Sequence, residues 1–238
     1  MRAIILAAGR GERMRPLTDT TPKPLLLVQG KPLIVWHIEA LAAGGVRDIV
    51  INTAWLSEQF PATLGDGSRY GVRLHFSDES REPGGALETA GGIRKALPLL
   101  RDGGAESFWV ASADVFVPGF RFDAEAAARF AADPQLDGRL WMVANSPHHP
   151  SGDFAIDAQG LALSERHGAA PEQPRLTWSC LGLFKARLFD ALPLGQAVRL
   201  RHCLEDAIGR RALAAEAYHG AWTDVGTPER LARLNQAP

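Results

Sequence analysis

The chain has 238 residues, of which 46% are hydrophobic and 22% are charged. A chain of this size and composition can bury a substantial core, as one large α/β domain with at most a small appendage. Its 26 basic and 27 acidic residues leave a formal charge of −1, so there is no overall field to hold nucleic acid or an acidic membrane. Any anion would have to be bound by a local cluster of basic side chains.

The cysteines and the N-terminus further limit which class of protein this chain can be. Cys180 and Cys203 are the only cysteines, and neither belongs to a Cys-x-x-Cys motif. This favours reduced thiols in a cytoplasmic protein over a disulfide framework or a zinc site, and we expect both in the core. The apolar run at the N-terminus is broken by Gly9 and is too short for a signal peptide or a membrane span. We therefore expect a soluble, cytoplasmic protein.

Strand and helix patterns alternate through the first half of the chain. Apolar residues at alternating or helical spacing define the elements, and glycine or proline marks most of their ends. The predicted elements here are a strand at 2–6, a helix from Pro32 to Gly44, a strand at 48–52, a helix at 55–64, a strand at 72–76, a helix at 87–100 and a strand at 106–111. Such alternation is typical of α/β folds with a parallel sheet.

The second half is less regular and predicts mixed or antiparallel pairing. Its predicted elements are strands at 140–143 and 176–184, a short hairpin at 154–156 and 161–163, helices at 186–192 and 200–214, and a last helix from Glu229. We expect these strands to extend the same sheet. The predicted fold class is α/β, with a Rossmann-like, mixed but mostly parallel sheet flanked by helices.

The loop after the first predicted strand combines glycines with basic side chains. Gly9 and Gly11 let backbone N–H groups approach a phosphate, and cations neutralise it. The cations of this region are Arg10, Arg13, Arg15 and Lys23. Glycines can also serve only to shape such a turn, and neither a dinucleotide fingerprint nor a Walker loop is present. The loop alone therefore indicates a phosphate site without deciding its ligand.

A longer run around this loop carries a family resemblance. Leu-Ala-Ala-Gly-x-Gly-x-Arg-x-x-Pro-x-Thr at residues 6–18, followed by Pro-Lys-Pro at 22–24, resembles the signature of the sugar-phosphate nucleotidyltransferases. Asp114 follows the strand at 106–111, and Asp224 lies in a Trp-x-Asp-x-Gly-Thr run; both match the two magnesium ligands of that family. The resemblance implies a Mg²⁺ cofactor, which prefers carboxylates combined with phosphate oxygens and water.

The resemblance covers nearly the whole chain and implies its organisation. We expect a single nucleotidyltransferase domain over residues 1–238, like the nucleotidyltransferase and glycosyltransferase-A folds. Residues 1–114 would form the nucleotide-binding half and residues 115–195 a small sugar-binding half, both approximately. Residues 196–238 would return to the core with the second metal ligand.

Individual residues also receive roles from the resemblance. Arg13 would hold the leaving pyrophosphate and Lys23 would contact the phosphate under attack, so both are predicted to be catalytic. The predicted nucleotide contacts are Ala8, Gly9, Gly11, Glu12, Arg13, Lys23, Glu79 and Gly91, the last two at the base. The predicted sugar contacts are Ser112, Asn145, Asp153 and Glu165. His148 and His149 point to opposite faces of an extended segment, which favours a structural or substrate-lining role over a metal site.

Within the family, the chain most closely resembles the N-acetylmuramate α-1-phosphate uridylyltransferases. Residues 64–71, 87–93 and 148–154 carry this closer resemblance. It implies magnesium-dependent transfer of UMP from UTP to N-acetylmuramate α-1-phosphate, giving a UDP-sugar and pyrophosphate in peptidoglycan recycling. The implied partners are these two small-molecule substrates, with no nucleic acid and no membrane; association into a homo-oligomer stays open.

Two other functions stay open at this point. The same chemistry could act on mannose 1-phosphate with GTP, or on glucose 1-phosphate with dTTP or UTP. A non-catalytic nucleotide-sugar sensor is the other alternative. The joint presence of four residues argues against a sensor, because a pure binding module need not keep them all. These residues are Arg13, Lys23, Asp114 and Asp224.

The sequence departs from the family pattern at three places. Ser112-Ala113-Asp114 stands where relatives commonly have Asn-Gly-Asp or Gly-Asp. An insertion at residues 80–86 lengthens the loop on the base side, and Ser164-Glu165-Arg166 stands in the place of a Glu-Lys-Pro tripeptide. The choice of sugar and of base is therefore the part of the prediction that the motifs constrain least.

Overall fold

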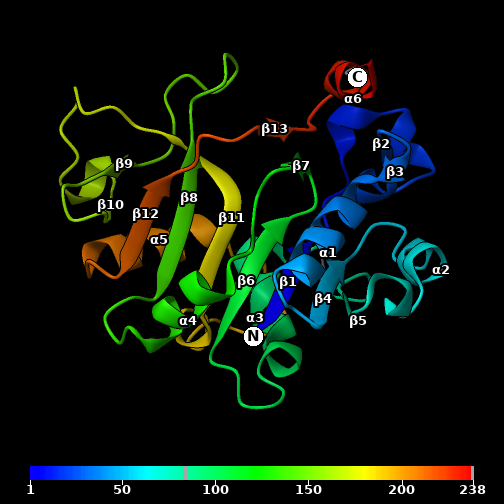
Figure 1. Cartoon of the computed structure of the whole chain (residues 1–238), viewed down its shortest axis with the longest axis horizontal. Helices are drawn as coiled ribbons and strands as arrows, with labels where there is room; N and C mark the ends of the chain where they lie inside the picture. Colours follow the sequence, from blue (N-terminus) through cyan, green and yellow to red (C-terminus); the bar gives the residue numbers. More distant parts are fainter. Residues whose placement is uncertain (83–84, 237–238) are drawn as a thin grey trace.

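The computed structural model describes residues 1–82 and 85–236. Residues 83–84, within the predicted insertion, and residues 237–238 at the end of the predicted domain lie outside this described part. One sheet of seven strands runs through the molecule in the order β12-β8-β11-β6-β1-β4-β5 (Figure 1). Its strands are β1 (Arg2–Leu6), β4 (Asp48–Thr53), β5 (Arg73–Asp78), β6 (Ser107–Ser112), β8 (Gly138–Val143), β11 (Thr177–Lys185) and β12 (Leu213–Ala217).

The strand directions confirm the predicted mixed, mostly parallel sheet. β11 is antiparallel to both of its neighbours, β6 and β8, and the other neighbouring pairs of the sheet are parallel. The strands of the second half therefore continue the sheet that begins with β1. The predicted hairpin is also confirmed, because β9 (Ala155–Ile156) pairs antiparallel with β10 (Ala162–Leu163).

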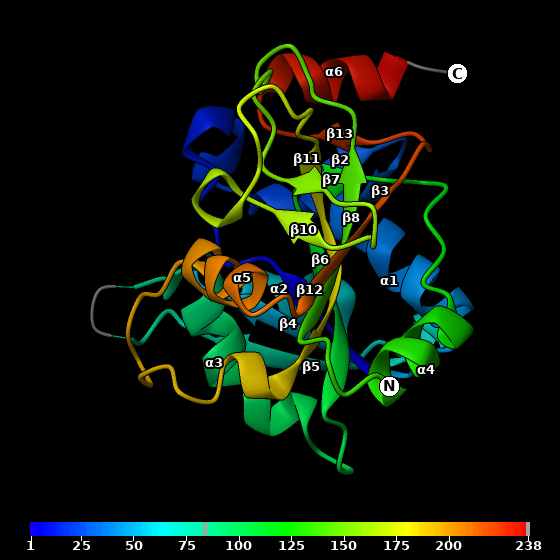
Figure 2. The ribbon, with the colours of Figure 1, turned by 90° about the vertical axis from the view of Figure 1, so that its left-hand side faces the viewer.

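Helices cover both faces of the sheet (Figure 2). α1 and α4 lie on one face, and α3 and α5 lie on the other. The helices are α1 (Leu33–Ala43), α2 (Gln59–Leu64), α3 (Glu88–Leu100), α4 (Ala124–Ala132), α5 (Leu200–Gly209) and α6 (Pro228–Gln236). Within the described part of the chain, no helix combines the length and the apolar content needed to span a bilayer.

Side-chain alternation along β1 builds a core on each face. Ala3 and Ile5 are fully buried with residues of α1, whereas Ile4 between them is fully buried with residues of α3 and α5. Successive side chains of a strand point to opposite faces, so a continuous apolar run is what a strand covered on both faces requires. Each fully buried isoleucine stabilises the fold by roughly 2 kcal/mol.

Short elements gather beyond the carboxyl ends of the parallel strands. The two-residue strands β7 (Val115–Phe116) and β13 (Thr223–Asp224) pair antiparallel there, beside β2 (Leu27–Val28), β3 (Lys31–Pro32) and α6 (Figure 1). A separate apolar cluster holds these pieces together. It consists of Met14, Val28, Leu33, Phe116, Val225 and Leu231. The candidate site lies next to these short elements.

Three predicted helices need correction. The helix predicted at 55–64 is only α2, because the Trp55 indole donates to the Thr18 carbonyl (3.0 Å) and Leu56 has a left-handed φ of +48°. The helix predicted at 186–192 is a single 3₁₀ turn, Ala186–Leu188. Arg211, with φ +55°, interrupts the helix predicted at 200–214. The chain then enters β12.

Helix α4 was not predicted, although its sequence carries the signals. Asp123 caps it by accepting hydrogen bonds from the N–H groups of Glu125 (3.0 Å) and Ala126 (3.2 Å). An aspartate N-cap followed by an alanine-rich run is typical of a helix start. Its buried face is formed by Ala127 and Phe130.

Candidate active site

The loop after β1 is shaped by Gly11. Its φ of +66° is a left-handed conformation that glycine adopts without strain, and a Cβ there would lie 3.1 Å from side-chain atoms of both Lys23 and Thr18. The Thr18 hydroxyl donates to the Gly11 carbonyl (2.9 Å), and the Met14 N–H donates to the same carbonyl (2.8 Å). The loop is thus folded closely against the segment that carries Lys23.

A cavity of about 540 Å³ opens over this loop at the carboxyl ends of β1 and β6. Ligands of open α/β sheets bind where the strand order reverses, which here is at β1. The predicted residues that line the cavity are Ala8, Gly9, Gly11, Glu12, Arg13, Lys23, Ser112 and Asp114. The other predicted residues lie outside its described lining: Glu79, Gly91, Asn145, Asp153, Glu165 and Asp224.

Lys23 and Asp114 form an ion pair in the wall of this cavity. The Lys23 side chain is 10% exposed, and its Nζ lies 3.0 Å from Asp114 Oδ2. The Ser112 hydroxyl donates to Asp114 Oδ1 (2.7 Å). Partial burial raises the pKa of Asp114, but the Lys23 ammonium and the Ser112 hydroxyl outweigh it and leave the pKa below its ordinary value. Asp114 is therefore a carboxylate at neutral pH.

The pairing of β7 with β13 brings Asp224 next to the segment that carries Asp114. Asp224 lies opposite Val115 in this pair, and the Val225 N–H donates to the Asp114 carbonyl (2.8 Å). Buried His37 of α1 supports β7, with its Nε2 2.8 Å from the Val115 carbonyl. Burial lowers the pKa of His37, so that a neutral imidazole donates this bond.

Both oxygens of Asp224 have side-chain partners. Oδ2 contacts Nη1 of Arg230 on α6, and Oδ1 lies 3.0 Å from His148 Nε2. Gly226, which lines the cavity, allows this close packing. A Cβ at Gly226 would lie 2.9 Å from Asp224 Oδ2 and 3.6 Å from Arg13 Nη2. Asp224 thus sits beside the cavity, behind Gly226.

The side chains around Asp114 and Asp224 limit which metal ion could bind there. Within residues 1–82 and 85–236, no group of three or more histidine, cysteine or acidic side chains is arranged to hold a metal ion. Asp114 and Asp224 alone would leave most coordination positions to phosphate oxygens and water. This fits Mg²⁺, which commonly keeps several waters and one or two carboxylates, and does not fit a closed zinc site.

Glu79 lies behind the cavity wall and not in it. The side chain is fully buried; Oε1 accepts from Asn52 Nδ2 (2.8 Å) and Oε2 accepts from the Leu87 N–H (2.8 Å). Asn52 in turn accepts from the Ala7 N–H (2.8 Å). Burial raises the pKa of Glu79 despite these bonds. This placement favours a role for Glu79 in fixing Asn52 over the predicted direct contact with a base.

Gly91 is likewise removed from the cavity. It is buried in the first turn of α3, and its N–H donates to the Val198 carbonyl (3.2 Å). The Ala90 N–H donates to the same carbonyl (2.9 Å), and the Val198 N–H donates to the Leu87 carbonyl (3.0 Å). Gly91 therefore joins α3 to the segment before α5, and the predicted contact with a base does not match this placement.

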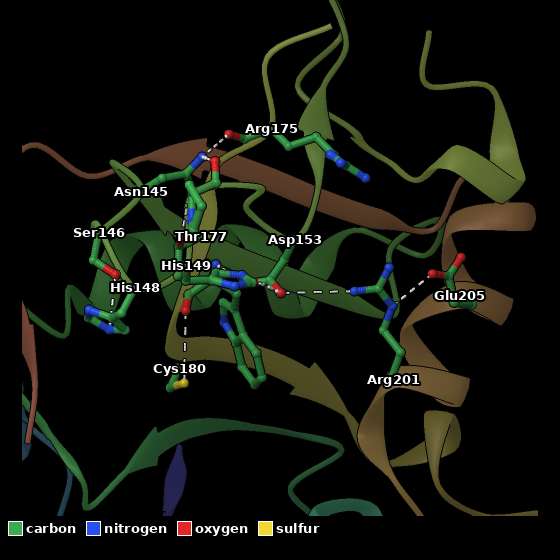
Figure 3. A network of polar contacts seen from close by, with 12 residues as sticks. Asn145, Ser146, His148, His149, Asp153, Arg175, Thr177, Cys180, Arg201 and Glu205 are labelled. Carbon is green, nitrogen blue, oxygen red and sulfur yellow. Dashed lines mark hydrogen bonds and ion pairs between the residues drawn. The ribbon is translucent and has the colours of Figure 1, made fainter. Parts of the chain in front are cut away.

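Two of the predicted sugar residues, Asn145 and Asp153, are held in a network of polar contacts (Figure 3). Asn145 donates to the carbonyls of Pro150 (3.0 Å) and Arg175 (2.9 Å) and accepts from the Thr177 hydroxyl (2.9 Å). Asp153 accepts from the Trp178 N–H (2.8 Å) and lies 4.0 Å from Arg201 Nη1. These two side chains are braced by their neighbours, whereas Ser112 lies in the main cavity.

Glu165 lies at a different place from the other predicted sugar residues. It pairs with Arg175, and both line a second cavity of about 240 Å³. The remaining lining residues of that cavity are Arg166, Arg201, His202 and Glu205. The structure therefore separates Glu165 from the cavity that holds Ser112 and Asp114.

The two cysteines are free thiols, as predicted. Cys203 is buried, whereas Cys180 is half-buried at an irregularity of β11 with a φ of +63°. Burial raises the pKa of Cys180, and the carboxylates of Asp114, Asp153 and Asp224 raise it further. Cys180 is thus a neutral thiol at neutral pH.

A family model described as nucleotidyl transferase matches residues 2–237. The chain belongs to this nucleotidyl transferase family. The N-acetylmuramate α-1-phosphate uridylyltransferase of Neisseria meningitidis serogroup B is 44% identical over 231 residues, which cover 97% of this chain and 95% of that protein. The protein of the same name from Caulobacter vibrioides is 33% identical over 246 residues, covering 95% and 92%. The predicted family is confirmed.

Structural similarity supports the same fold for this nucleotidyltransferase. HddC from Yersinia pseudotuberculosis, whose crystal structure contains GMP-PN, superposes with a TM-score of 0.75 at 19% identity. The match covers 99% of this chain and 98% of that chain. Similarity at this level of identity shows the fold alone, and the predicted fold class is confirmed.

The structure adds cavity residues that the motifs did not single out. Asn52, Glu88, Thr89 and Gly226 all line the main cavity of this nucleotidyltransferase. Asn52 was detectable as a polar residue at the end of a buried strand beside β1. Gly226 directly follows the run that contains Asp224. Glu88 and Thr89 belong to the predicted helix at 87–100 and to a run that carries the family resemblance, but their position in the cavity depends on tertiary structure.

Proposed function

We propose that this nucleotidyltransferase transfers UMP from UTP to N-acetylmuramate α-1-phosphate. The observation that carries the proposal is the Lys23–Asp114 pair in one cavity with Arg13 and the glycine loop, beside Asp224. Two relatives, 44% and 33% identical, bear the name of this uridylyltransferase, which supports the choice of UTP and of the sugar. The products would be a UDP-sugar and pyrophosphate, for use in peptidoglycan recycling in the cytoplasm.

The reaction is one displacement at phosphorus. A phosphate oxygen of the sugar 1-phosphate attacks the α-phosphorus of UTP and forms the new P–O bond. The bond from the α-phosphorus to the bridging oxygen breaks, and pyrophosphate leaves with the electron pair. Because the nucleophile is already an anion, no general base is needed. Catalysis then consists of positioning two anions and stabilising the charge of the transition state.

The loop cations and N–H groups would perform the positioning on the nucleotide side. Arg13 would bind the leaving pyrophosphate together with the N–H groups of Gly11 and Glu12. Lys23 would contact the α-phosphate, since its ammonium is nearly buried and is fixed by Asp114. A fixed cation stabilises charge at the reacting phosphorus without reorganising during the reaction.

Asp114 and Asp224 are the residues that would hold Mg²⁺. When bound, the ion neutralises charge on the two phosphates that must approach each other. Arg230 and His148 contact the two oxygens of Asp224 and would orient its carboxylate. The Ser112 hydroxyl would orient Asp114 in the same way. On the sugar side, the network around Asp153 would shape the wall that faces the sugar.

An activity matrix tests this proposal. UTP, GTP and dTTP would each be combined with the α-1-phosphates of N-acetylmuramate, mannose and glucose, with and without Mg²⁺, while released pyrophosphate is measured. We expect the highest kcat/KM for UTP with N-acetylmuramate α-1-phosphate and no release without a divalent ion. Preference for GTP or for another sugar 1-phosphate would show that the proposed substrates are wrong. Absence of turnover with every pair would contradict the enzymatic proposal itself.

A further inference from the structure

Glu88 occupies an unusual position in the main cavity. It is the first residue of α3 and has a φ of +58°, in the left-handed region that favours glycine. Its side chain is 50% exposed, and the residue lines the cavity together with Thr89 and Ala86. A glycine here would avoid the strain, so a glutamate in this conformation beside the cavity points to a use for its carboxylate.

The surroundings fix where this carboxylate lies. Three hydrogen bonds hold the start of α3 in place: the Leu87 N–H donates to Glu79, the Val198 N–H donates to the Leu87 carbonyl, and the Ala90 N–H donates to the Val198 carbonyl. Glu79 also binds Asn52, which accepts from the Ala7 N–H. Glu88 is thus connected to the beginning of the phosphate loop, where the nucleoside end of a bound triphosphate would emerge.

Arg199 lies beside the Glu88 side chain. Its Nε lies 3.8 Å from Glu88 Oε1, and it follows the Val198 residue that is bonded to α3. The loop cations Arg13 and Lys23 also line the cavity, but a carboxylate could not bind the phosphates that they attract. A carboxylate in this wall is therefore suited to an uncharged hydrogen-bond donor of the ligand and not to its phosphates.

The ribose is the part of a nucleotide that offers such donors. We propose that the Glu88 carboxylate accepts hydrogen bonds from the ribose hydroxyl groups, so that the site selects ribonucleotides over deoxyribonucleotides. The vicinal 2′ and 3′ hydroxyls present two donors to the two carboxylate oxygens. The pairing edge of uracil instead presents two carbonyl oxygens around one N–H, and a carboxylate would repel both. This inference rests on the proposed function only in taking a nucleotide as the ligand of the main cavity.

Binding of UTP and 2′-dUTP by the full chain, measured by calorimetry with Mg²⁺ and without sugar phosphate, tests the inference. The wild type should bind UTP about tenfold or more tightly than 2′-dUTP, the range expected for hydrogen bonds to a charged group. E88G should reduce this ratio to below about threefold by weakening UTP, and E88Q should fall between. The thermal midpoint of E88G should equal or exceed that of the wild type, because strain is relieved.

Gln29 offers a matched control, because it is exposed, has a φ of +51° and lies outside the described lining of the cavity. Q29G should leave the UTP to 2′-dUTP ratio unchanged. If E88G keeps the wild-type ratio of UTP to 2′-dUTP affinity, the inference is overturned. It is also overturned if E88G changes only the ratio of UTP to CTP affinity, because Glu88 would then contact the base. If GTP binds and UTP does not, the substrate proposal fails, and the ratio of GTP to 2′-dGTP tests Glu88 independently.

Discussion

The region at β1 and β6 and the region at β8 and β11 use their polar side chains differently. At the ends of β1 and β6, Arg13, Lys23 and Asp114 line one open cavity. Around β8 and β11, Asn145 and Asp153 are bonded mainly to backbone carbonyl and N–H groups of Pro150, Arg175 and Trp178. The first region presents charge to a ligand, and the second uses polar groups to hold a wall in shape. Substitutions should therefore affect chemistry in the first region and stability or sugar affinity in the second.

The largest effect is expected from D114A. Removing the carboxylate takes away one of the two expected Mg²⁺ ligands and the partner of Lys23, so kcat should fall by about 10³-fold or more. Pyrophosphate release under saturating substrates measures this loss, and the far-UV circular dichroism spectrum should stay unchanged. D102N is a suitable control, because Asp102 pairs with Arg2 at an exposed position. Activity of D114A close to that of the wild type would show that the metal assignment is wrong.

A smaller loss is expected from K23A. The variant keeps Asp114 and Asp224 but lacks the fixed ammonium, so kcat should fall by about 10²-fold. Steady-state kinetics with varied UTP separates this effect from a change in KM. K31A, which removes another paired lysine outside the described lining of the cavity, should retain full activity. An equal loss in both variants would mean that Lys23 acts through stability alone.

On the sugar side, D137N should act on stability and depend on pH. Burial raises the pKa of Asp137, but Arg210 and Arg187 outweigh it and leave the pKa below its ordinary value. Because the pKa of Asp137 is lower in the folded than in the unfolded chain, its carboxylate stabilises the fold above the unfolded-state pKa of about 4. This stabilisation is lost as the pH falls towards the folded-state pKa. The unfolding free energy of D137N should therefore be about 2 kcal/mol lower than that of the wild type at pH 7, as expected for hydrogen bonds to a charged group, and the difference should be clearly smaller at pH 3, as measured by urea unfolding. A pH-independent loss would contradict this origin.

The smallest effect on turnover is expected from N145A. Asn145 makes three hydrogen bonds, so its removal should lower the unfolding free energy by about 1–2 kcal/mol. The KM for the sugar phosphate should rise several-fold, because the network wall loosens, while UTP binding stays the same. T177V removes one of these bonds and should show a smaller change of the same kind. A loss of UTP affinity in N145A would contradict the division between the two regions.

Local sequence patterns predicted the central strands and the phosphate loop, because alternating apolar residues and glycines report on nearby backbone. They did not predict β7, since a strand of two residues has no hydrophobic period. The assignment of Glu79 to the base came from the family resemblance and not from a local pattern, and no local pattern indicates that Glu79 is buried and bonded to Asn52. Helix 200–214 was extended too far, because Arg211 adopts a left-handed φ of +55° only in the folded chain. Tertiary pairing decided each of these cases.

The most direct test of the proposed reaction is ³¹P NMR of the full chain mixed with UTP, N-acetylmuramate α-1-phosphate and Mg²⁺. We predict that the UTP resonances are replaced by those of pyrophosphate and of a sugar-linked diphosphate, in equal amounts. Unchanged UTP, or its conversion to UDP and inorganic phosphate, would contradict the assignment of this cavity to nucleotidyl transfer onto that sugar phosphate.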